Sequence, residues 1–348
     1  MHAVPSTNET TTGEAPARKL RGDWTPINYD LRDTWFPVSH SRDLCARPIR
    51  RIIHAQPYYL WRENGLPIAA EFHPQRSKGE ALHLSEFTGG SGFYPVVERY
   101  GYIWAWYGNP DAADPLQLPH IPFLPEDGNI PGYTQRTVRF DATSALSVEN
   151  LIDLTHADFL HANTIGDGIS ESDVVEVEWT SETVTRTRTV AQKSVAPIMR
   201  WVGGVRAKYQ DFRAVLHIHL RSNVCISYPR FRPGYDVPNL QPFLPVGKHR
   251  SRCDVTFNTT AAPAPFRYVM PRINYIIQPQ DNSVVRPQNQ RYFEADERLD
   301  MHSRFDKPGT RYRYQMEQLA ERQAAGQFAY GSDAEPGRDI SGLLGMND

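Results

Sequence analysis

Short runs rich in apolar and aromatic residues recur along the first third of the chain. Three strand-like runs follow one another, at Pro48–His54, Pro57–Arg62 and Leu66–Phe72, and Asn64-Gly65 between the last two runs is a hairpin signal. Phe93–Tyr107 alternates large apolar residues with others, which is typical of a half-buried strand. These runs predict a small β-domain, which we place at residues 24–110.

A second group of alternating runs follows a stretch rich in Pro and Asp at residues 111–132, which predicts a linker. The predicted strands are Thr134–Phe140, Val174–Trp179, Thr183–Val190, Lys208–Ile218, Asn223–Tyr228, Arg252–Ala261 and Tyr268–Ile277. Helical patterns occupy Ser144–Leu160 and Arg291–Gln327, the second with a break near Pro308. Several strands with turns between them and separate helices predict an α+β domain with an antiparallel sheet, at residues 133–330.

The two ends of the chain are rich in small and polar residues, which predicts a disordered tail at residues 1–23 and a mobile tail at residues 331–348. The formal net charge is only −2, so nothing favours nucleic acid or an anionic membrane as a partner. No apolar run approaches the roughly 18 residues that a membrane helix needs, and the N-terminus lacks the apolar core of a secretory signal. The three cysteines are widely spaced and support neither a disulfide framework nor a thiolate zinc site. We therefore expect a cytoplasmic protein.

The densest group of residues with metal-binding chemistry lies in the sequence ENLIDLTHADFLHANTIGD, which contains Asn150, Asp153, His156 and His161. Imidazole nitrogens ligate divalent metals, and a carboxylate can hold such an imidazole from behind. On a helix, Asp153 and His156 are neighbours on one face, whereas His156 and His161 lie roughly 140° apart. A metal shared by the two histidines therefore requires a bend or an irregular turn between them.

This string, Glu-Asn-x-x-Asp-x-x-His-x-x-x-x-His followed by Thr-Ile-Gly-Asp, resembles the mononuclear iron site of the Rieske-type non-haem iron oxygenases, in particular the O- and N-demethylating monooxygenases. The resemblance implies that His156 and His161 ligate Fe(II) together with a distant Asp, as a 2-His-1-carboxylate triad. It places the third ligand in the acidic part of the C-terminal helix. Asp296 is our choice there, and Glu294 and Asp300 are the alternatives.

In the same family, the N-terminal domain carries a C-x-H pair and a C-x-x-H pair that ligate a [2Fe–2S] cluster. Here His73 and Gln75 stand where the first Cys and the first His would be, and the stretch from there to Phe93 has no Cys. His83 is the only other candidate ligand in it, and we interpret His73 and His83 as ordinary surface histidines. The expected fold is thus a Rieske-like β-domain without a cluster, followed by a helix-grip catalytic domain.

The resemblance implies an enzyme that uses O2 to hydroxylate a small aromatic or heteroaromatic substrate, with N- or O-demethylation and release of formaldehyde. Asp153 matches the family's bridging residue on the electron route to the iron, and Asn150 matches a polar neighbour of the iron. Without a cluster in this chain, electrons from NAD(P)H should arrive through a separate reductase with a Rieske or ferredoxin-type centre, docked near Asp153. A methylxanthine N-demethylase component is a resembling case, and the family implies a trimer-based homo- or hetero-oligomer.

Residues that face the substrate should come from two segments, Ile198–Tyr228 and Asn274–Val285. An aromatic or apolar lining with a few polar groups would suit a flat ring. Asn223, His217 and Asn282 are the candidates for polar contacts in these segments.

Two other interpretations compete with this one. The first is an Fe(II) and 2-oxoglutarate oxygenase, because His156-Ala157-Asp158 is an H-x-D motif that His219 and Arg230 could complete. That motif should lie at the end of a strand, whereas this segment predicts helix. The second is a non-catalytic structural subunit of a hetero-oligomeric Rieske oxygenase, which the lost cluster motif suggests. The presence of the complete iron-site string argues against it.

Overall fold

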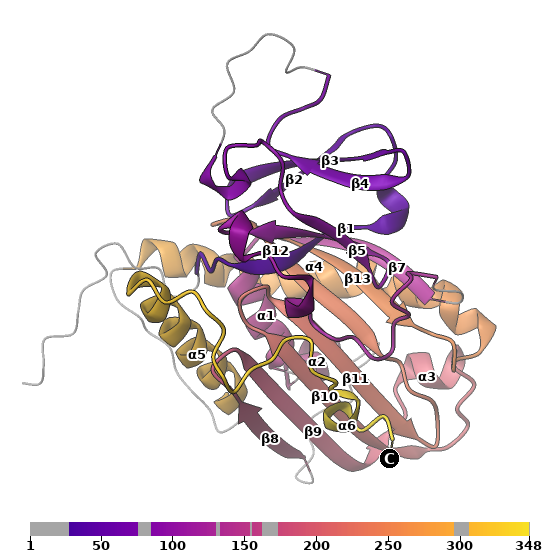
Figure 1. Ribbon diagram of the computed structural model, residues 1–348. Helices are drawn as coiled ribbons and strands as arrows, with labels where there is room; N and C mark the ends of the chain where they lie inside the picture. Colours follow the sequence, from indigo (N-terminus) through magenta and orange to yellow (C-terminus); the bar gives the residue numbers. More distant parts are fainter. Residues whose placement is uncertain are drawn as a thin grey trace, which may run out of the picture.

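The computed structural model describes residues 28–75, 85–129, 133–153, 155–161, 173–295 and 306–347. Its strands form antiparallel sheets in two units, a smaller one near the N-terminus that lies on a larger one (Figure 1). The larger unit combines a broad sheet with helices. The predicted α+β fold, a small β-domain followed by a helix-bearing antiparallel sheet, is therefore confirmed.

The smaller unit contains two three-stranded sheets. The first, in the order β1-β6-β5, consists of β1 (Thr34–His40), β6 (Tyr102–Tyr107) and β5 (Val96–Arg99), and the second of β2 (Ile49–Ile53), β3 (Gln56–Glu63) and β4 (Leu66–Ala70). Asn64 and Gly65 join β3 to β4 with φ values of 52° and 83°. Asn and Gly tolerate this left-handed region best, so the predicted hairpin is confirmed.

The larger sheet has seven strands in the order β7-β13-β12-β11-β10-β9-β8. They are β7 (Tyr133–Phe140), β8 (Val174–Trp179), β9 (Thr183–Ser194), β10 (Tyr209–His219), β11 (Val224–Arg232), β12 (Asn239–Gly247) and β13 (Arg250–Asn258). Sequence reasoning missed β12, which contains Pro242 and Pro245. Proline cannot donate to a strand ladder and normally indicates that a central strand is absent.

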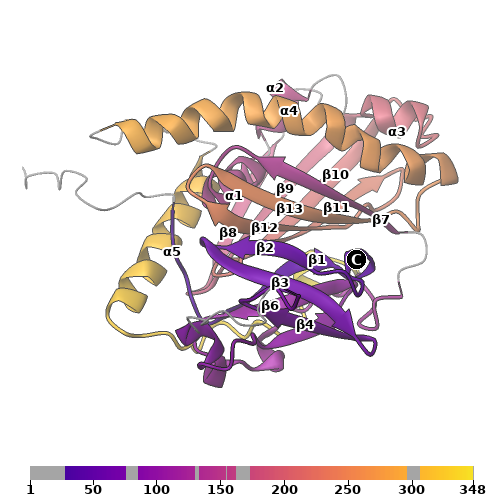
Figure 2. The same ribbon diagram turned by 90° about the horizontal axis from the view of Figure 1, so that it is seen from above.

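The helices are α1 (Ser144–Ile152), α2 (Thr155–Leu160), α3 (Pro197–Trp201), α4 (Ala264–Glu294), α5 (Lys307–Ala324) and α6 (Ser341–Leu344). Figure 2 shows α4 lying lengthwise along the large sheet, with α3 near one of its ends. The predicted strand Tyr268–Ile277 is wrong, because these residues belong to α4. Its aromatic and β-branched residues favour strand, and prolines inside α4 at 271, 279 and 287 oppose helix.

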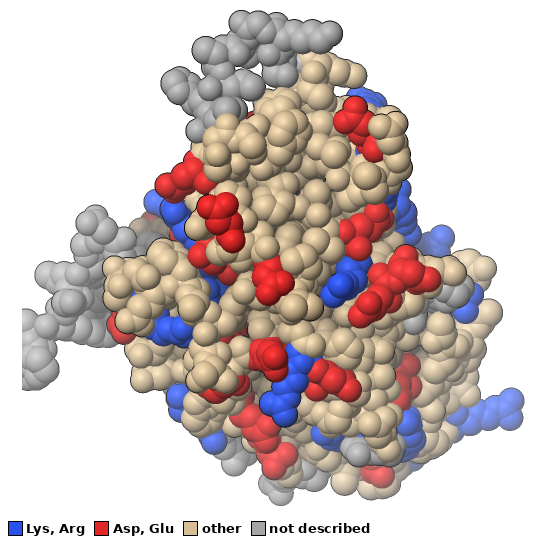
Figure 3. Space-filling model, in the orientation of Figure 1, with Lys and Arg blue, Asp and Glu red and all other residues tan. Residues whose placement is uncertain are grey.

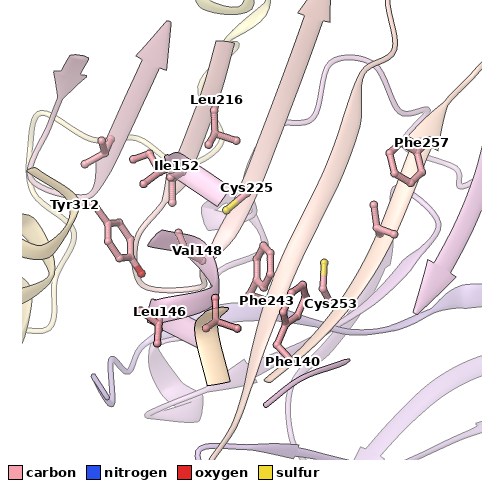
Figure 4. Packing of buried hydrophobic residues seen from close by; sticks show 14 of the residues in the cluster. Phe140, Leu146, Val148, Ile152, Leu216, Cys225, Phe243, Cys253, Phe257 and Tyr312 are labelled. Atoms are coloured by element: carbon pink, nitrogen blue, oxygen red, sulfur yellow. The ribbon is translucent and has the colours of Figure 1, made fainter. Parts of the chain in front are cut away.

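The two faces of the large sheet pack against different partners. Leu216 of β10 belongs to the core shared with the helices, and its neighbour Val215 belongs to the core shared with the smaller unit. Figure 4 shows part of the helix-side core, with labelled side chains from α1, α5 and the sheet: Phe140, Leu146, Val148, Ile152, Leu216, Cys225, Phe243, Cys253, Phe257 and Tyr312. The two faces therefore divide the molecule into a helix side and a small-domain side.

The C-terminal segment is packed rather than a mobile tail, which corrects the expectation for residues 331–348. Ile340 and Leu344 are 7% and 0% exposed and lie in the core between the large sheet and the smaller unit. Within the predicted linker, Leu118, Ile121 and Phe123 are buried in the same core. The expected N-terminal tail, residues 1–23, lies outside the described residues.

The described helices include none that is long and apolar enough to cross a membrane. On the face shown in Figure 3, acidic and basic side chains are intermixed over both units. That face therefore carries no broad field of one sign that would attract a polyanion.

Candidate metal centre

The segment that carries the two histidines consists of two short helices with a break between them. Thr143 caps α1, since its side-chain oxygen accepts a hydrogen bond from the backbone N–H of Leu146 at 3.2 Å. Asp153 ends α1 with non-helical φ and ψ of −82° and 84°. The predicted single helix Ser144–Leu160 is therefore interrupted, but the break lies just before His156 and not between the two histidines, where the sequence predicted it.

The second helix positions both imidazoles. His156 lies near the start of α2, and His161 follows its last residue, with the His161 backbone N–H donating to the Ala157 carbonyl at 3.1 Å. The two rings meet edge to face, with centroids 5.4 Å apart. The imidazole rings of two histidines five positions apart therefore lie side by side.

Each imidazole is held through Nδ1. The Nδ1 of His156 contacts the backbone carbonyl oxygen of Asp153, and the Nδ1 of His161 lies 2.8 Å from Oε1 of Gln280. Because both partners are oxygen acceptors, each Nδ1 carries the hydrogen and each Nε2 is left to bind a ligand. Such an anchored Nδ1–H is the usual support of a metal-binding histidine.

Both Nε2 atoms converge on one carboxylate, that of Asp281 in α4. Oδ1 of Asp281 lies 3.5 Å from Nε2 of His156 and 3.0 Å from Nε2 of His161. Two ligands at right angles on a metal with bonds of about 2.0–2.2 Å would lie roughly 3 Å apart. His161 and Asp281 are only 1% and 7% exposed. Within the described ranges, these three residues are the one group of His, Cys, Asp or Glu arranged to hold a metal ion.

The charges of the site suit a divalent cation. Burial raises the pKa of Asp281, but hydrogen bonds and the charges of His156 and His161 outweigh burial and bring this pKa to about 2. Burial lowers the pKa of His161, and the contacts with Asp281 and Gln280 outweigh burial, so its pKa is raised. The carboxylate is thus ionised at neutral pH, the form in which it ligates a metal. A donor set of two imidazoles and one carboxylate fits non-haem Fe(II).

The sequence did not single out Asp281. Asp296 and Asp300 lie outside the described residues, and Glu294 is an exposed residue at the end of α4 whose Oε1 accepts a hydrogen bond from Gln290. Asp281 occupies a buried stripe with the helical period, formed by Phe266, Met270, Ile273, Asp281, Val285, Asn289 and Tyr292. A lone acid within an apolar helical stripe was the available signal, and it was lost because Tyr268–Ile277 was interpreted as a strand.

Asp153 and Asn150 both lie close to the triad, in different ways. Asp153 contacts His156 through its backbone carbonyl, and the buried guanidinium of Arg186 on β9 is within its electrostatic reach. Asn150 lines the cavity beside the triad. The contact behind His156 thus comes from the backbone of Asp153 and not from the carboxylate that the sequence suggested, and the roles of Asp153 and Asn150 stay predictions.

The triad opens into a cavity of about 260 Å³ between α4 and the large sheet. Its lining is mostly apolar and includes Phe140, Met199, Phe212, Phe231, Phe243, Phe257, Phe266 and Met270. Both segments expected to face the substrate contribute, with Ile198 to Ser227 from one and Asn274 to Asp281 from the other. An apolar slot with a few polar groups suits a flat ring.

The three polar candidates for substrate contact lie elsewhere. Asn223 donates to Ser144 Oγ at 3.2 Å, and Asn282 accepts from the backbone N–H of Asp141 at 3.1 Å. Nδ1 of His217 pairs with the hydroxyl of Thr185 at 2.7 Å, on the small-domain face of β10. Strand alternation explains the last error, because His217 and Leu216 face opposite sides of the sheet.

The motif of the 2-oxoglutarate interpretation is not arranged as it requires. His156, Ala157 and Asp158 lie on the helix α2 rather than at a strand end, and the carboxylate beside the histidines comes from α4. The ring of His219 packs against that of His217 at 4.9 Å, away from the cavity. This alternative is therefore set aside.

In the smaller unit, His73 is half-buried. Its Nδ1 accepts a hydrogen bond from the backbone N–H of Gln75 at 3.2 Å, and its ring contacts that of Tyr59 at 5.6 Å. His83 lies outside the described residues. Cys45 is exposed, whereas Cys225 and Cys253 are buried in the larger unit.

Comparison with known proteins gives a family and a fold. The family model described as "Vanillate O-demethylase oxygenase C-terminal domain" matches residues 140–322, more than half of the chain. The vanillate O-demethylase oxygenase subunit of Pseudomonas sp. (strain HR199 / DSM 7063) is 31% identical over 107 residues, which cover 31% of this chain and 30% of that protein. The alignment thus spans less than a third of this curated relative.

Two solved structures resemble the chain over most of its length. Dicamba monooxygenase bound to dicamba superposes with a TM-score of 0.70 at 18% identity, covering 85% of this chain and 99% of that one. The Pseudomonas putida CBB5 NdmA QL mutant with caffeine superposes with a TM-score of 0.59 at 14% identity, covering 87% and 97%. At these identities the likeness establishes the fold of both units.

Proposed function

The chain belongs to the family of the vanillate O-demethylase oxygenase C-terminal domain, and from this premise we propose that it is the oxygenase component of a demethylase that uses mononuclear Fe(II) and O2. This family membership agrees with the resemblance to the Rieske-type oxygenases read from the sequence. The observation that carries the proposal is the convergence of His156, His161 and Asp281 at an apolar cavity. The substrate would be an aromatic or heteroaromatic methyl ether or N-methyl compound.

We assign the third ligand to Asp281 rather than to Asp296. Asp281 already lies within 3.5 Å of both Nε2 atoms, and its charge is balanced there by the two histidines. Substitution distinguishes the two candidates: Asp281→Asn should lose tight Fe(II) binding, whereas Asp296→Asn should keep it. The opposite result would return the assignment to Asp296.

Bound by this triad, Fe(II) would supply the activation of O2 that hydroxylation of a methyl group requires. The overall reaction balances when one oxygen atom enters the C–H bond of the methyl group and the other leaves as water, with two electrons and two protons taken up. The resulting hemiacetal or hemiaminal collapses to formaldehyde and a phenol or an amine.

Residues of this chain would orient the two histidine ligands and exclude water from the bound substrate. Gln280 and the Asp153 carbonyl fix the ring planes of the two histidines. The aromatic lining takes up the flat substrate ring and displaces water from it. Asn150 offers a polar group beside the triad.

The two electrons would come from NAD(P)H through a separate protein with a Rieske or ferredoxin-type centre. The sequence supports this route, because His73 and Gln75 replace the first ligand pair of a cluster. Asp153, between His156 and the buried Arg186, is the proposed entry point. Asp153→Asn should slow reduction by the partner while the iron content stays unchanged. A trimer-based homo- or hetero-oligomer is the proposed assembly.

The test of the function is the content of iron and acid-labile sulfide per chain, measured after purification without chelators, together with formaldehyde release. About one iron without sulfide is expected, since one triad holds one metal. Two or more irons with matching sulfide would contradict the cluster-free proposal. A chain that takes up no Fe(II) under anaerobic conditions would overturn the enzyme and favour a structural subunit.

A further inference from the structure

A buried amide on the wall of the cavity has no partner in the part of the chain that the structure describes. Gln210, near the start of β10, is 1% exposed and lines the cavity, yet neither its Oε1 nor its Nε2 has a hydrogen-bond partner there. Burying an amide without hydrogen bonds is costly. A residue that carries this cost at a cavity wall has the character of a ligand contact.

Other amides on the same wall are paired within the chain. Gln241 of β12 lines the cavity, and its Nε2 donates to Oδ1 of Asn239 at 2.7 Å. Nδ2 of Asn239 in turn donates to the Val237 carbonyl at 3.3 Å. Among the described amides that line the cavity, Gln210 alone has both polar atoms buried and unpaired. The unpaired amide is therefore a feature of this one point of the wall.

Strand alternation directs Gln210 into the cavity together with an aromatic neighbour. Gln210, Phe212 and Ala214 occupy every second position of β10, and all three line the cavity. The ring of Phe212 contacts that of Phe231 at 5.1 Å, and Phe231 lines the cavity as well. A ligand that pairs with the amide would therefore place its attached ring against these aromatic side chains.

The donor and the acceptor of the amide select a complementary group on the ligand. Oε1 accepts hydrogen bonds and Nε2 donates them. A carboxylate or a ketone offers only acceptors and would leave Oε1 unpaired, whereas an amidinium offers only donors and would leave Nε2 unpaired. A primary carboxamide or a lactam offers one donor and one acceptor on the same edge. Such a group can therefore pair with both atoms at once.

The position of Gln210 along its strand separates it from the triad. Leu216 of β10 pairs with Arg186 of β9, whose guanidinium is within electrostatic reach of Asp153 behind His156. Gln210 lies six positions before Leu216 on the same strand. At the rise of a strand this is roughly 20 Å. Gln210 therefore belongs to the end of the cavity that is distant from the triad.

That end of the cavity lies beside α3 and the start of α4. Tyr209, next to Gln210, pairs with Ser194, the last residue of β9 before α3. Gly203, just after α3, abuts Tyr235, whose ring packs on Phe266 at 5.4 Å. Figure 2 shows α3 near one end of α4. The start of β10 is therefore at the Phe266 end of α4.

The length of α4 along the cavity agrees with the separation along β10. The helix lines the cavity from Phe266 to Asp281, a stripe that extends roughly 20 Å at the helical rise per residue. The triad lies at the Asp281 end of this stripe. A ligand that reaches both ends must therefore be longer than a single aromatic ring.

We propose that Gln210 binds the carboxamide or lactam edge of an elongated neutral aromatic substrate, whose methylated group lies at the triad. The inference rests on the proposed function, because it names the substrate class of the same site. Nε2 of Gln210 donates to the carbonyl oxygen of the ligand, and the ligand N–H donates to Oε1. Both buried atoms are then paired, in apolar surroundings where such hydrogen bonds are strong. Gln210 thereby sets a preference for neutral amides over aromatic acids.

The test measures binding without turnover, by calorimetry under nitrogen on the chain with and without Fe(II). The probes are a methoxybiphenyl carboxamide, the methyl ketone of the same shape, the matching carboxylate and the single-ring methoxybenzamide. The biphenyl carboxamide should bind most tightly. Its affinity should exceed that of the ketone by about 10- to 100-fold, because the ketone leaves Oε1 of Gln210 unpaired.

Two substitutions of Gln210 probe the pairing from the side of the protein. Gln210→Leu should remove the preference for the carboxamide over the ketone, since no polar side-chain atom remains. Gln210→Glu keeps the shape of the side chain but, when ionised, offers only acceptors. It should therefore prefer methoxybiphenyl carboxamidine, which offers only donors, to the carboxamide. This reversal covers the case in which Gln210→Leu does not fold.

Gln241→Leu is the matched control, because Gln241 lines the same cavity and its amide is already paired with Asn239. It makes the same chemical change at another point of the wall. The ratio of the carboxamide and ketone affinities should stay that of the natural chain.

Equal affinity of the natural chain for the carboxamide and the ketone would overturn the inference, since water would then satisfy the amide as well as a ligand does. Tighter binding of the carboxylate, or equal effects of Gln210→Leu and Gln241→Leu, would overturn it too. Tighter binding of methoxybenzamide than of the biphenyl carboxamide would contradict the proposed length. None of these results depends on demethylation. A chain that prefers the carboxamide through Gln210 but releases no formaldehyde would refute the proposed function alone.

Discussion

The two ends of the cavity differ in how fully the protein satisfies its own polar groups. At the triad, each histidine has a partner for Nδ1 and directs Nε2 to Asp281. At the opposite end, both polar atoms of the Gln210 amide have none. The first end is preorganised by the chain, as a metal site must be. The second end keeps a buried amide whose polar atoms the protein leaves unpaired, which is costly.

The largest effect should come from removing a ligand of the preorganised end. His161→Ala should abolish tight Fe(II) binding and formaldehyde release, because two donors cannot hold a site built for three. Iron per chain after anaerobic loading and gel filtration measures it. His73→Ala is the control, since we interpret His73 as an ordinary surface histidine, and it should bind iron as the natural chain does. Equal iron in both variants would contradict the triad.

A smaller effect at the same end should come from the residue behind His161. Gln280→Leu removes the acceptor of Nδ1–H and should weaken Fe(II) binding by about 10- to 100-fold, the usual cost of losing an outer-shell partner. A competitive chelator titration measures it. Gln278→Leu is the matched control on the same helix, because Gln278 donates to the Arg139 carbonyl instead. If both variants bind iron equally, Gln280 does not orient the ligand.

The sequence predicted the part of the site that is contiguous and missed the part that is not. His156 and His161 lie in one string, so their spacing and neighbours could be compared with a known pattern. Asp281 lies 120 positions beyond His161. It belongs to a helix whose aromatic, β-branched and proline residues favoured the prediction of a strand. The carboxylate was therefore sought further along the chain, at Asp296.

The prediction of the fold likewise succeeded where the signal is local and failed where it depends on tertiary packing. Strands with clean alternation, such as Val174–Trp179, were predicted with their observed bounds. The central strand β12 was missed because of its prolines, and the C-terminal segment was taken for a tail because its few apolar residues, including Leu344, are buried only by the tertiary fold. An unpaired amide such as that of Gln210 has no sequence signal, since partners are a property of the packed structure.

The smallest effect should come from the unpaired amide of Gln210, and it has the opposite sign. Gln210→Leu replaces an unpaired buried amide with an apolar group of similar size. In the absence of ligand it should raise the free energy of unfolding by about 1 kcal/mol, because it removes an uncompensated desolvation cost. Denaturant titration measures the change.

The matched control is Gln315→Leu, which replaces a glutamine that is 7% exposed and whose Nε2 donates to the Thr180 carbonyl. The control should lower stability, since it leaves that carbonyl unpaired. If both substitutions destabilise equally, the amide of Gln210 is already satisfied in the free protein, and the contrast between the two ends of the cavity is lost.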